Sequence, residues 1–108
     1  MLLGDNVRVK VGSGSDLQIY HNGTNSFLSG GNAHALKILS GNFRVRNAAD
    51  TENILNGVEN GAVELYYDNS KKLETDSIGV KLEDNNHVSF GTGSDFKIHF
   101  DGSHAYLD

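Results

Sequence analysis

Hydrophobic and polar residues alternate in short runs along most of the chain, a pattern that predicts β-strands with one covered face. In residues 5–11 every second position from Val7 onward is a valine. In residues 63–67 Val63 and Leu65 alternate with glutamate and tyrosine. No segment shows the 3.6-residue period of an amphipathic helix.

Turn-forming residues separate these runs at regular intervals, which is typical of an all-β fold. The stretch 47–60 is ambiguous, and its Asn56-Gly57 dipeptide favours another strand and turn over a helical turn. About ten short strands result. Besides the two runs above, strands are predicted at 17–21, 27–28, 36–39, 42–46, 71–75, 78–83, 88–90, 96–100 and 106–107.

The chain contains one sequence motif twice. Residues 12–29 and 91–108 align without gaps, and both copies begin with a Gly-x-Gly-Ser-Asp loop. Many other positions keep their chemical type, as in the pair Leu17 and Phe96. Each copy consists of a glycine loop, a strand, a turn and a returning strand, so the predicted repeat is a β-hairpin.

The Asn22-Gly23 dipeptide of the first copy predicts a two-residue hairpin turn, in which both turn positions have positive φ. The alternation then assigns a face to each strand residue, and the aligned residues of the second copy follow the same assignment. Leu17, Ile19, Phe96 and Ile98 are expected to face a core, and Gln18 and Lys97 are expected to face solvent.

The composition narrows the possible roles of this chain. Hydrophobic residues make up 37% of the 108 residues, so the core is small or shared between chains. A net charge of −5 without a basic stripe argues against nucleic acid as a partner. There are no cysteines for disulfides or thiolate metal sites, and no run is apolar enough for membrane insertion. The last residues lie within a predicted strand, so we expect a piece of a longer chain.

No motif predicts an enzyme or a bound cofactor. The two glycine loops lead into strands, whereas a phosphate-binding loop needs a following helix. Neither 84–86 nor 101–103 completes a calcium loop with its closing glutamate. The sequence therefore predicts no catalytic residue, no cofactor and no metal ligand.

His21 is the only histidine that invites a special role. It aligns with Phe100 on the predicted apolar face, whereas His99 aligns with Tyr20 on the other face. If three chains shared an axis, three His21 imidazoles would meet there in an axial cluster. The competing interpretation is a packed histidine with an ordinary hydrogen bond.

Three exposed tyrosines are candidates for glycan contact, because aromatic rings beside Asn- and Asp-rich turns can stack on sugars. They are Tyr20, Tyr66 and Tyr106. Single tyrosines on strands are also common without any such role.

Two strings of the sequence resemble repeats in tail-fibre and related virion proteins of tailed bacteriophages, particularly marine ones. These are Gly14-Ser-Asp-Leu-Gln-Ile-Tyr-His-Asn-Gly and Glu64-Leu-Tyr-Tyr-Asp-Asn-Ser-Lys-Lys-Leu. The similarity covers 12–29, 61–82 and 91–108. It implies a structural virion protein, a segment of a tail fibre or similar extracellular appendage that supports host attachment through a surface glycan or receptor. Parallel homotrimers are the usual assembly of such proteins, and the resemblance implies no catalytic residue.

The predicted architecture is therefore all-β: residues 1–108 form one β-repeat segment of an elongated, trimeric β-helix-like or β-prism-like fibre. The hairpin repeats 12–29 and 91–108 flank intervening strands within 36–83. A thin apolar set on one face of each strand needs a partner, which identical chains would supply. The alternative is a monomeric β-sandwich that binds glycans, and an enzyme is a distant third reading.

Overall fold

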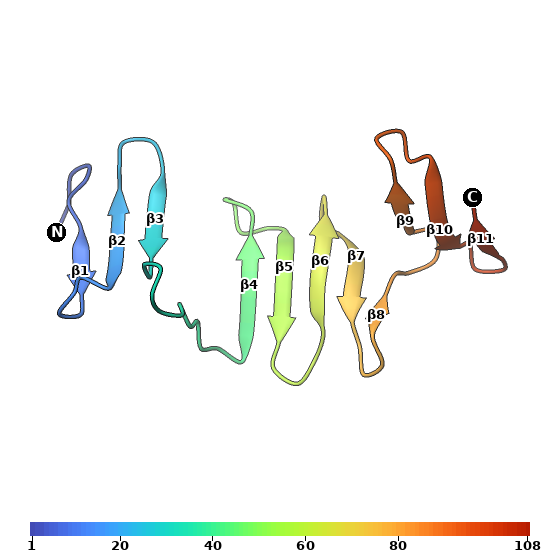
Figure 1. Ribbon diagram of the computed structural model, residues 1–108, viewed down its shortest axis with the longest axis horizontal. Helices are drawn as coiled ribbons and strands as arrows, with labels where there is room; N and C mark the ends of the chain where they lie inside the picture. Colours follow the sequence, from blue (N-terminus) through green and yellow to red (C-terminus); the bar gives the residue numbers. More distant parts are fainter. The chain divides into compact units, whose positions relative to one another are not determined.

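The computed structural model describes all residues from 1 to 108 and shows an all-β protein with antiparallel sheets and no helix (Figure 1). The chain divides into two units, Met1–Leu39 and Ser40–Asp108. None of its elements is a helix that could cross a membrane. The expected fold class is confirmed at this level.

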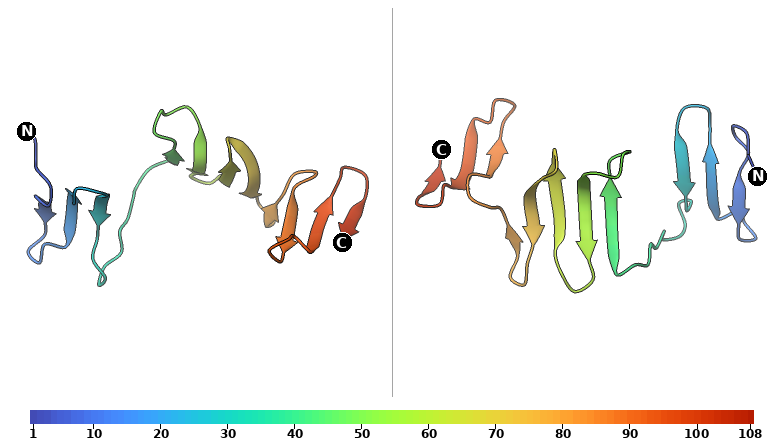
Figure 2. Two further views of the ribbon diagram at one scale, coloured as in Figure 1. Left: turned by 90° about the horizontal axis from the view of Figure 1, so that it is seen from above. Right: turned by 180° about the vertical axis from the view of Figure 1, so that it is seen from behind.

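Eleven strands form three sheets, and each sheet is a single layer (Figure 2). The first sheet consists of β1 (Val9–Val11), β2 (Leu17–His21) and β3 (Ser26–Ser29). The central sheet consists of β4 (Asn42–Arg46), β5 (Asn53–Val58), β6 (Val63–Tyr67), β7 (Ser70–Thr75) and β8 (Val80–Lys81). The last sheet consists of β9 (His87–Phe90), β10 (Phe96–Phe100) and β11 (Ala105–Leu107).

The sequence repeat is a three-stranded sheet in the structure, longer than the hairpin predicted. The strand that precedes each glycine loop pairs with the hairpin, as β1 does with β2 and β9 does with β10. We call residues 5–29 the N-terminal module and residues 84–108 the C-terminal module.

The two modules have matching backbones as well as matching strand order. Asn6 and Asn85 have positive φ angles of 63° and 69°. The Asn6 amide donates to the carbonyl of His21 at 2.7 Å, and the Asn85 amide donates to the carbonyl of Phe100 at 2.8 Å. Each module therefore begins with the same left-handed residue held against the end of its middle strand.

The hairpin turn differs from the two-residue turn that Asn22-Gly23 predicts. The loop has four residues, 22–25, and of the two dipeptide residues only Gly23 has a positive φ, 96°. The Asn22 side-chain oxygen accepts the amides of Thr24 and Asn25 at 3.0 and 2.8 Å. This Asx turn replaces the expected geometry, because the asparagine side chain takes the place of a backbone turn.

In the C-terminal module the same turn is built on an aspartate. The Asp101 oxygen Oδ1 accepts the amides of Ser103 and His104 at 2.8 and 2.7 Å. A two-residue turn with positive φ at both positions occurs elsewhere, at Asp68 and Asn69 between β6 and β7.

Two other sequence-based boundaries are wrong. Residues 36–39 form no strand, since no neighbouring strand pairs with them. Asn56-Gly57 lies inside β5 instead of in a turn, because both residues pair with β4 on one side and with β6 on the other. The chain turns later, where the Gly61 amide donates to the Val58 carbonyl at 3.0 Å.

Strand pairing places most hydrophobic residues of each sheet on one face, which we call the apolar face, whereas Phe27 and Val58 lie on the other face. The opposite face is called the polar face. On the N-terminal module the apolar face carries Val9, Val11, Leu17, Ile19, His21, Ser26 and Leu28. On the C-terminal module it carries Val88, Phe90, Phe96, Ile98, Phe100, Ala105 and Leu107. On the central sheet it carries Phe43, Val45, Leu55, Gly57, Val63, Leu65, Leu73, Thr75 and Val80.

The predicted alternation of faces is present, but the prediction of which face is buried is wrong for the single chain. Ile19 and Ile98 lie on the expected faces, yet they are 49% and 44% exposed. Gln18 and Lys97, which were expected to face solvent, are half-buried. No residue of the chain is buried, because each sheet is one layer thick and long polar side chains cover part of only one face.

Candidate functional site

The three apolar faces expose rows of hydrophobic side chains, and no charged strand residue lies on any of them. Leu65, on the middle strand of the central sheet, is 42% exposed. Isolated hydrophobic side chains on a surface are ordinary, whereas whole faces of this kind mark interaction sites. These faces are therefore the candidate functional surface.

His21 lies on the apolar face of the N-terminal module, as its alignment predicts. Its ring nitrogen Nδ1 forms a hydrogen bond with Ser26 Oγ at 3.0 Å, directly across from it on β3. At the equivalent place in the C-terminal module, Phe100 lies opposite Ala105. The hydrogen-bonded interpretation of His21 thus has a named partner, and the axial cluster stays a prediction.

The polar face of the central sheet is held together by charged side chains. A row of residues crosses all five strands: Arg44, Asn56, Glu64, Glu74 and Lys81. Lys71 Nζ lies 2.8 Å from Glu74 and 3.5 Å from Glu64, and Lys81 Nζ lies 2.8 Å from Glu74. The side chain of Glu74 is only 13% exposed, whereas Leu65 on the other face is 42% exposed.

These contacts shift the ionisation of the glutamates. The hydrogen bond from Lys71, followed by that from Lys81, lowers the pKa of Glu74 below its usual value. The hydrogen bond from Asn56, with Lys71 adding to it, lowers the pKa of Glu64. The pKa values of Lys71 and Lys81 are raised, chiefly by Glu74. Both glutamates therefore stay ionised, which suits an ion-pair network and not proton transfer.

The polar faces of the two modules carry stacked planar side chains at equivalent positions. In the N-terminal module the Arg8 guanidinium lies 3.8 Å from the centre of the Tyr20 ring, and Phe27 stacks on the same ring at 4.6 Å. In the C-terminal module His99 stacks between His87 at 4.8 Å and Tyr106 at 4.7 Å. We call these two sets the planar rows.

The planar rows are not predicted by the sequence repeat as it was defined above. The predicted repeat begins at residues 12 and 91, which excludes Arg8 and His87. Extending the alignment back to residues 5 and 84 pairs these two residues and would have revealed the rows.

The tyrosines proposed for glycan contact use their ring surfaces within the chain. Tyr20 lies on the middle strand, between Arg8 on one side and Phe27 on the other. Tyr106 stacks on His99 and donates a hydrogen bond to Asp101 Oδ2 at 3.1 Å. Tyr66 is half-buried on the polar face of the central sheet. Glycan contact at these residues stays a prediction.

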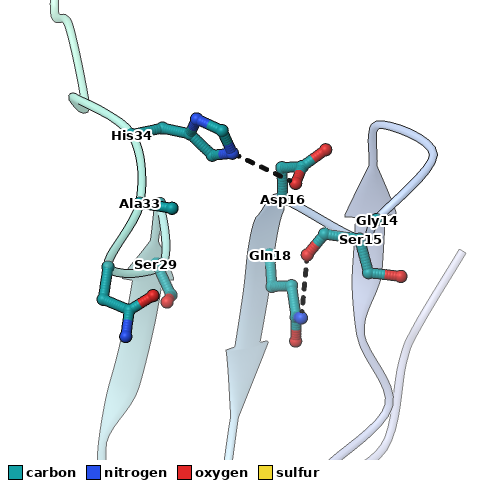
Figure 3. A pocket seen from close by; sticks show the side chains of 10 residues that line it. Gly14, Ser15, Asp16, Gln18, Ser29, Ala33 and His34 are labelled. Carbon is teal, nitrogen blue, oxygen red and sulfur yellow. Dashed lines mark hydrogen bonds and ion pairs between the residues drawn. The ribbon is translucent and has the colours of Figure 1, made fainter.

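A shallow polar pocket of about 200 Å³ lies beside the first glycine loop (Figure 3). His34 Nε2 reaches across it to Asp16 Oδ1 at 3.5 Å, and Gln18 donates to the Ser15 carbonyl at 3.0 Å (Figure 3). No serine hydroxyl bonds to His34, so serine, histidine and aspartate do not form a nucleophilic relay here.

No three histidine or carboxylate side chains converge on a point where they would hold a metal ion. Comparison of the chain with protein-family models, with characterised proteins and with solved structures finds no match. The surfaces described above are therefore the basis for assigning a function.

Proposed function

We propose that this chain is a structural segment of a virion appendage, such as a bacteriophage tail fibre, and that it acts as a homo-oligomer, a parallel trimer. The observation that carries the proposal is the complete lack of buried residues beside three charge-free apolar faces. A single layer of this kind cannot gain enough hydrophobic free energy to offset the entropy of folding. Copies of the same chain would supply the missing layer.

The distribution of charge supports the same surface. The net charge of −5 would make copies of the chain repel one another if their charged faces met. All charged strand residues lie off the apolar faces, so association through these faces brings no like charges together. The role in a virion itself rests on the resemblance of the repeat strings to phage fibre proteins.

A charge placed on an apolar face tests the proposal. Ile98→Asp should dissociate the assembly and unfold the chain, because an unpaired carboxylate would have to be buried between copies. Lys97→Asp, on the neighbouring residue of the polar face, is the matched control and should leave the assembly intact. Circular dichroism and light scattering would report both effects. If Ile98→Asp stays folded with an unchanged mass, the apolar face is not an interface.

The alternative is a monomeric β-sandwich, in which sheets of one chain cover each other's apolar faces. Its measurable consequence is different: the melting temperature of a monomer is independent of chain concentration, whereas that of an obligate trimer rises with it. A glycan-binding module of this kind would be a folded monomer at every concentration.

A further inference from the structure

The two modules share a backbone but differ in what they present on the apolar face. At the equivalent positions, the N-terminal module carries the hydrogen-bonded pair His21 and Ser26, and the C-terminal module carries Phe100 and Ala105. One face is thus interrupted by a polar pair at the turn end of its sheet, and the other is apolar throughout.

Without this difference, either module could take the place of the other in an interface between two chains. Two chains can associate with like modules together, or shifted so that the N-terminal module of one meets the C-terminal module of the next. The shifted arrangement leaves the central sheet of each chain uncovered, as well as one module at each end, and such head-to-tail contacts grow into open filaments. An assembly of fixed size needs something that disfavours the shift.

The chemistry of His21 favours contact between two N-terminal modules over contact between unlike modules. Its Nδ1 is bonded to Ser26, and no hydrogen bond within the chain uses its Nε2. Beside another N-terminal module, Nε2 meets the imidazole and hydroxyl of a second His21–Ser26 pair, which can donate or accept. Beside a C-terminal module it meets Phe100 and Ala105, which have no side-chain polar atom, and a buried ring nitrogen is left without a partner.

We propose that the His21–Ser26 pair is a register key, which makes the N-terminal module associate with the N-terminal modules of other copies of this chain. The partner of this surface is therefore a second copy, aligned like module to like module. A single buried polar residue fixes register in coiled coils by the same physics. The inference rests on the proposed homo-oligomer and adds the rule for how its chains align.

Cysteine cross-linking tests the alignment, since the chain has no native cysteine. Thr24 and Ser103 occupy equivalent turn positions, and their side chains make no hydrogen bond in the turn. The full-length chain with Thr24→Cys and Ser103→Cys is prepared with and without ¹⁵N, and the two samples are unfolded together and refolded at pH about 8, where ordinary imidazoles are neutral. After treatment with a short bis-maleimide and digestion, mixed-isotope peptides report contacts between chains.

Like-with-like cross-links, 24–24 and 103–103, should exceed 24–103 cross-links about ten-fold, as an unsatisfied buried nitrogen implies. In the same chain with His21→Phe and Ser26→Ala, which copy the C-terminal module, 24–103 cross-links should rise toward parity and large polydisperse species should form. Adding Phe100→His and Ala105→Ser to that variant should restore the preference, because the two modules then differ again.

Two results would overturn the register key: equal numbers of both kinds of cross-link in the parent chain, or an unchanged ratio after His21→Phe with Ser26→Ala. Both leave the homo-oligomer standing. If no mixed-isotope cross-link forms and the mass is that of one chain, the proposed function itself fails, so the two failures are distinguishable.

Discussion

At the scale of single residues, positive-φ positions decide where the strands of the modules end. Gly23 and Gly102 have φ angles of 96° and 98° in equivalent turns, a region that costs an L-residue about 1 to 2 kcal/mol. Gly79 also lies in a turn, but its φ is not positive and no atom lies within 4 Å of an added Cβ.

Gly23→Ala and Gly79→Ala should therefore change stability in opposite directions. We expect Gly23→Ala to lower the free energy of unfolding by about 1 to 2 kcal/mol. We expect Gly79→Ala to leave it unchanged or raise it by up to about 1 kcal/mol, because alanine restricts the unfolded chain. Urea unfolding at one fixed chain concentration measures both, and equal effects would mean that backbone strain does not control the turn.

Asp101 gives a residue-scale prediction about acid stability. The amide of His104, then that of Ser103, holds the pKa of Asp101 below its usual value of 3.8. Since the folded pKa is depressed, this stabilisation is complete above about 3.8 and is lost as the pH falls through the folded pKa. Asp101→Asn should remove that loss and keep the turn, because Asn22 makes the same turn in the N-terminal module.

The readout for Asp101→Asn is the unfolding midpoint between pH 2 and 5, compared with the parent chain. A parallel pH dependence in both proteins would mean that protonation of Asp101 does not cause the loss of stability in acid. An unfolded Asp101→Asn protein at pH 7 would show that the turn needs a charge.

At the scale of elements, each polar face is stabilised by contacts across its own strands, whereas the apolar faces stay exposed. The planar rows and the ion pairs around Lys71 join three or more neighbouring strands. Cross-strand pairs of this kind contribute about 0.2 to 1 kcal/mol each. They set the register of a sheet without giving it a core.

The ion pairs of the central sheet predict a second acid transition. Because Lys71 and Lys81 depress the folded pKa of Glu74, its contribution is present above the usual value of 4.5 and disappears as the pH falls through the folded pKa. Glu74→Gln should weaken the protein at pH 7 and flatten its pH dependence below about 4.5. Glu59→Gln, at an exposed carboxylate that forms no ion pair, is the control.

The sequence predicts the strands, and the face on which each residue lies, better than it predicts the turns and the burial of each face. Alternation correctly places Leu17 and Ile19 on one face, and Phe96 and Ile98 on the equivalent face, since a period of two allows only two choices. It mispredicts Asn22-Gly23 because a side chain can close a turn as well as a backbone can. It also predicts a strand at 36–39, because local pattern does not tell whether a partner strand exists.

The candidate surface was only partly predictable. The apolar faces and the place of His21 follow from alternation and from the repeat. The exposure of those faces does not, because burial depends on what lies above a sheet and not on the sheet itself. The contact between Lys71 and Glu64 depends on a register shift between Leu65 and Tyr66, which alternation of hydrophobic and polar residues does not predict.

At the scale of the whole molecule, the central proposal is that other copies of the chain cover the apolar faces. The most direct measurement is sedimentation equilibrium of the full chain over a wide range of concentrations, together with its melting temperature. We predict a species of three times 11.7 kDa and a melting temperature that rises with chain concentration. A folded species of 11.7 kDa with a concentration-independent transition would contradict the claim.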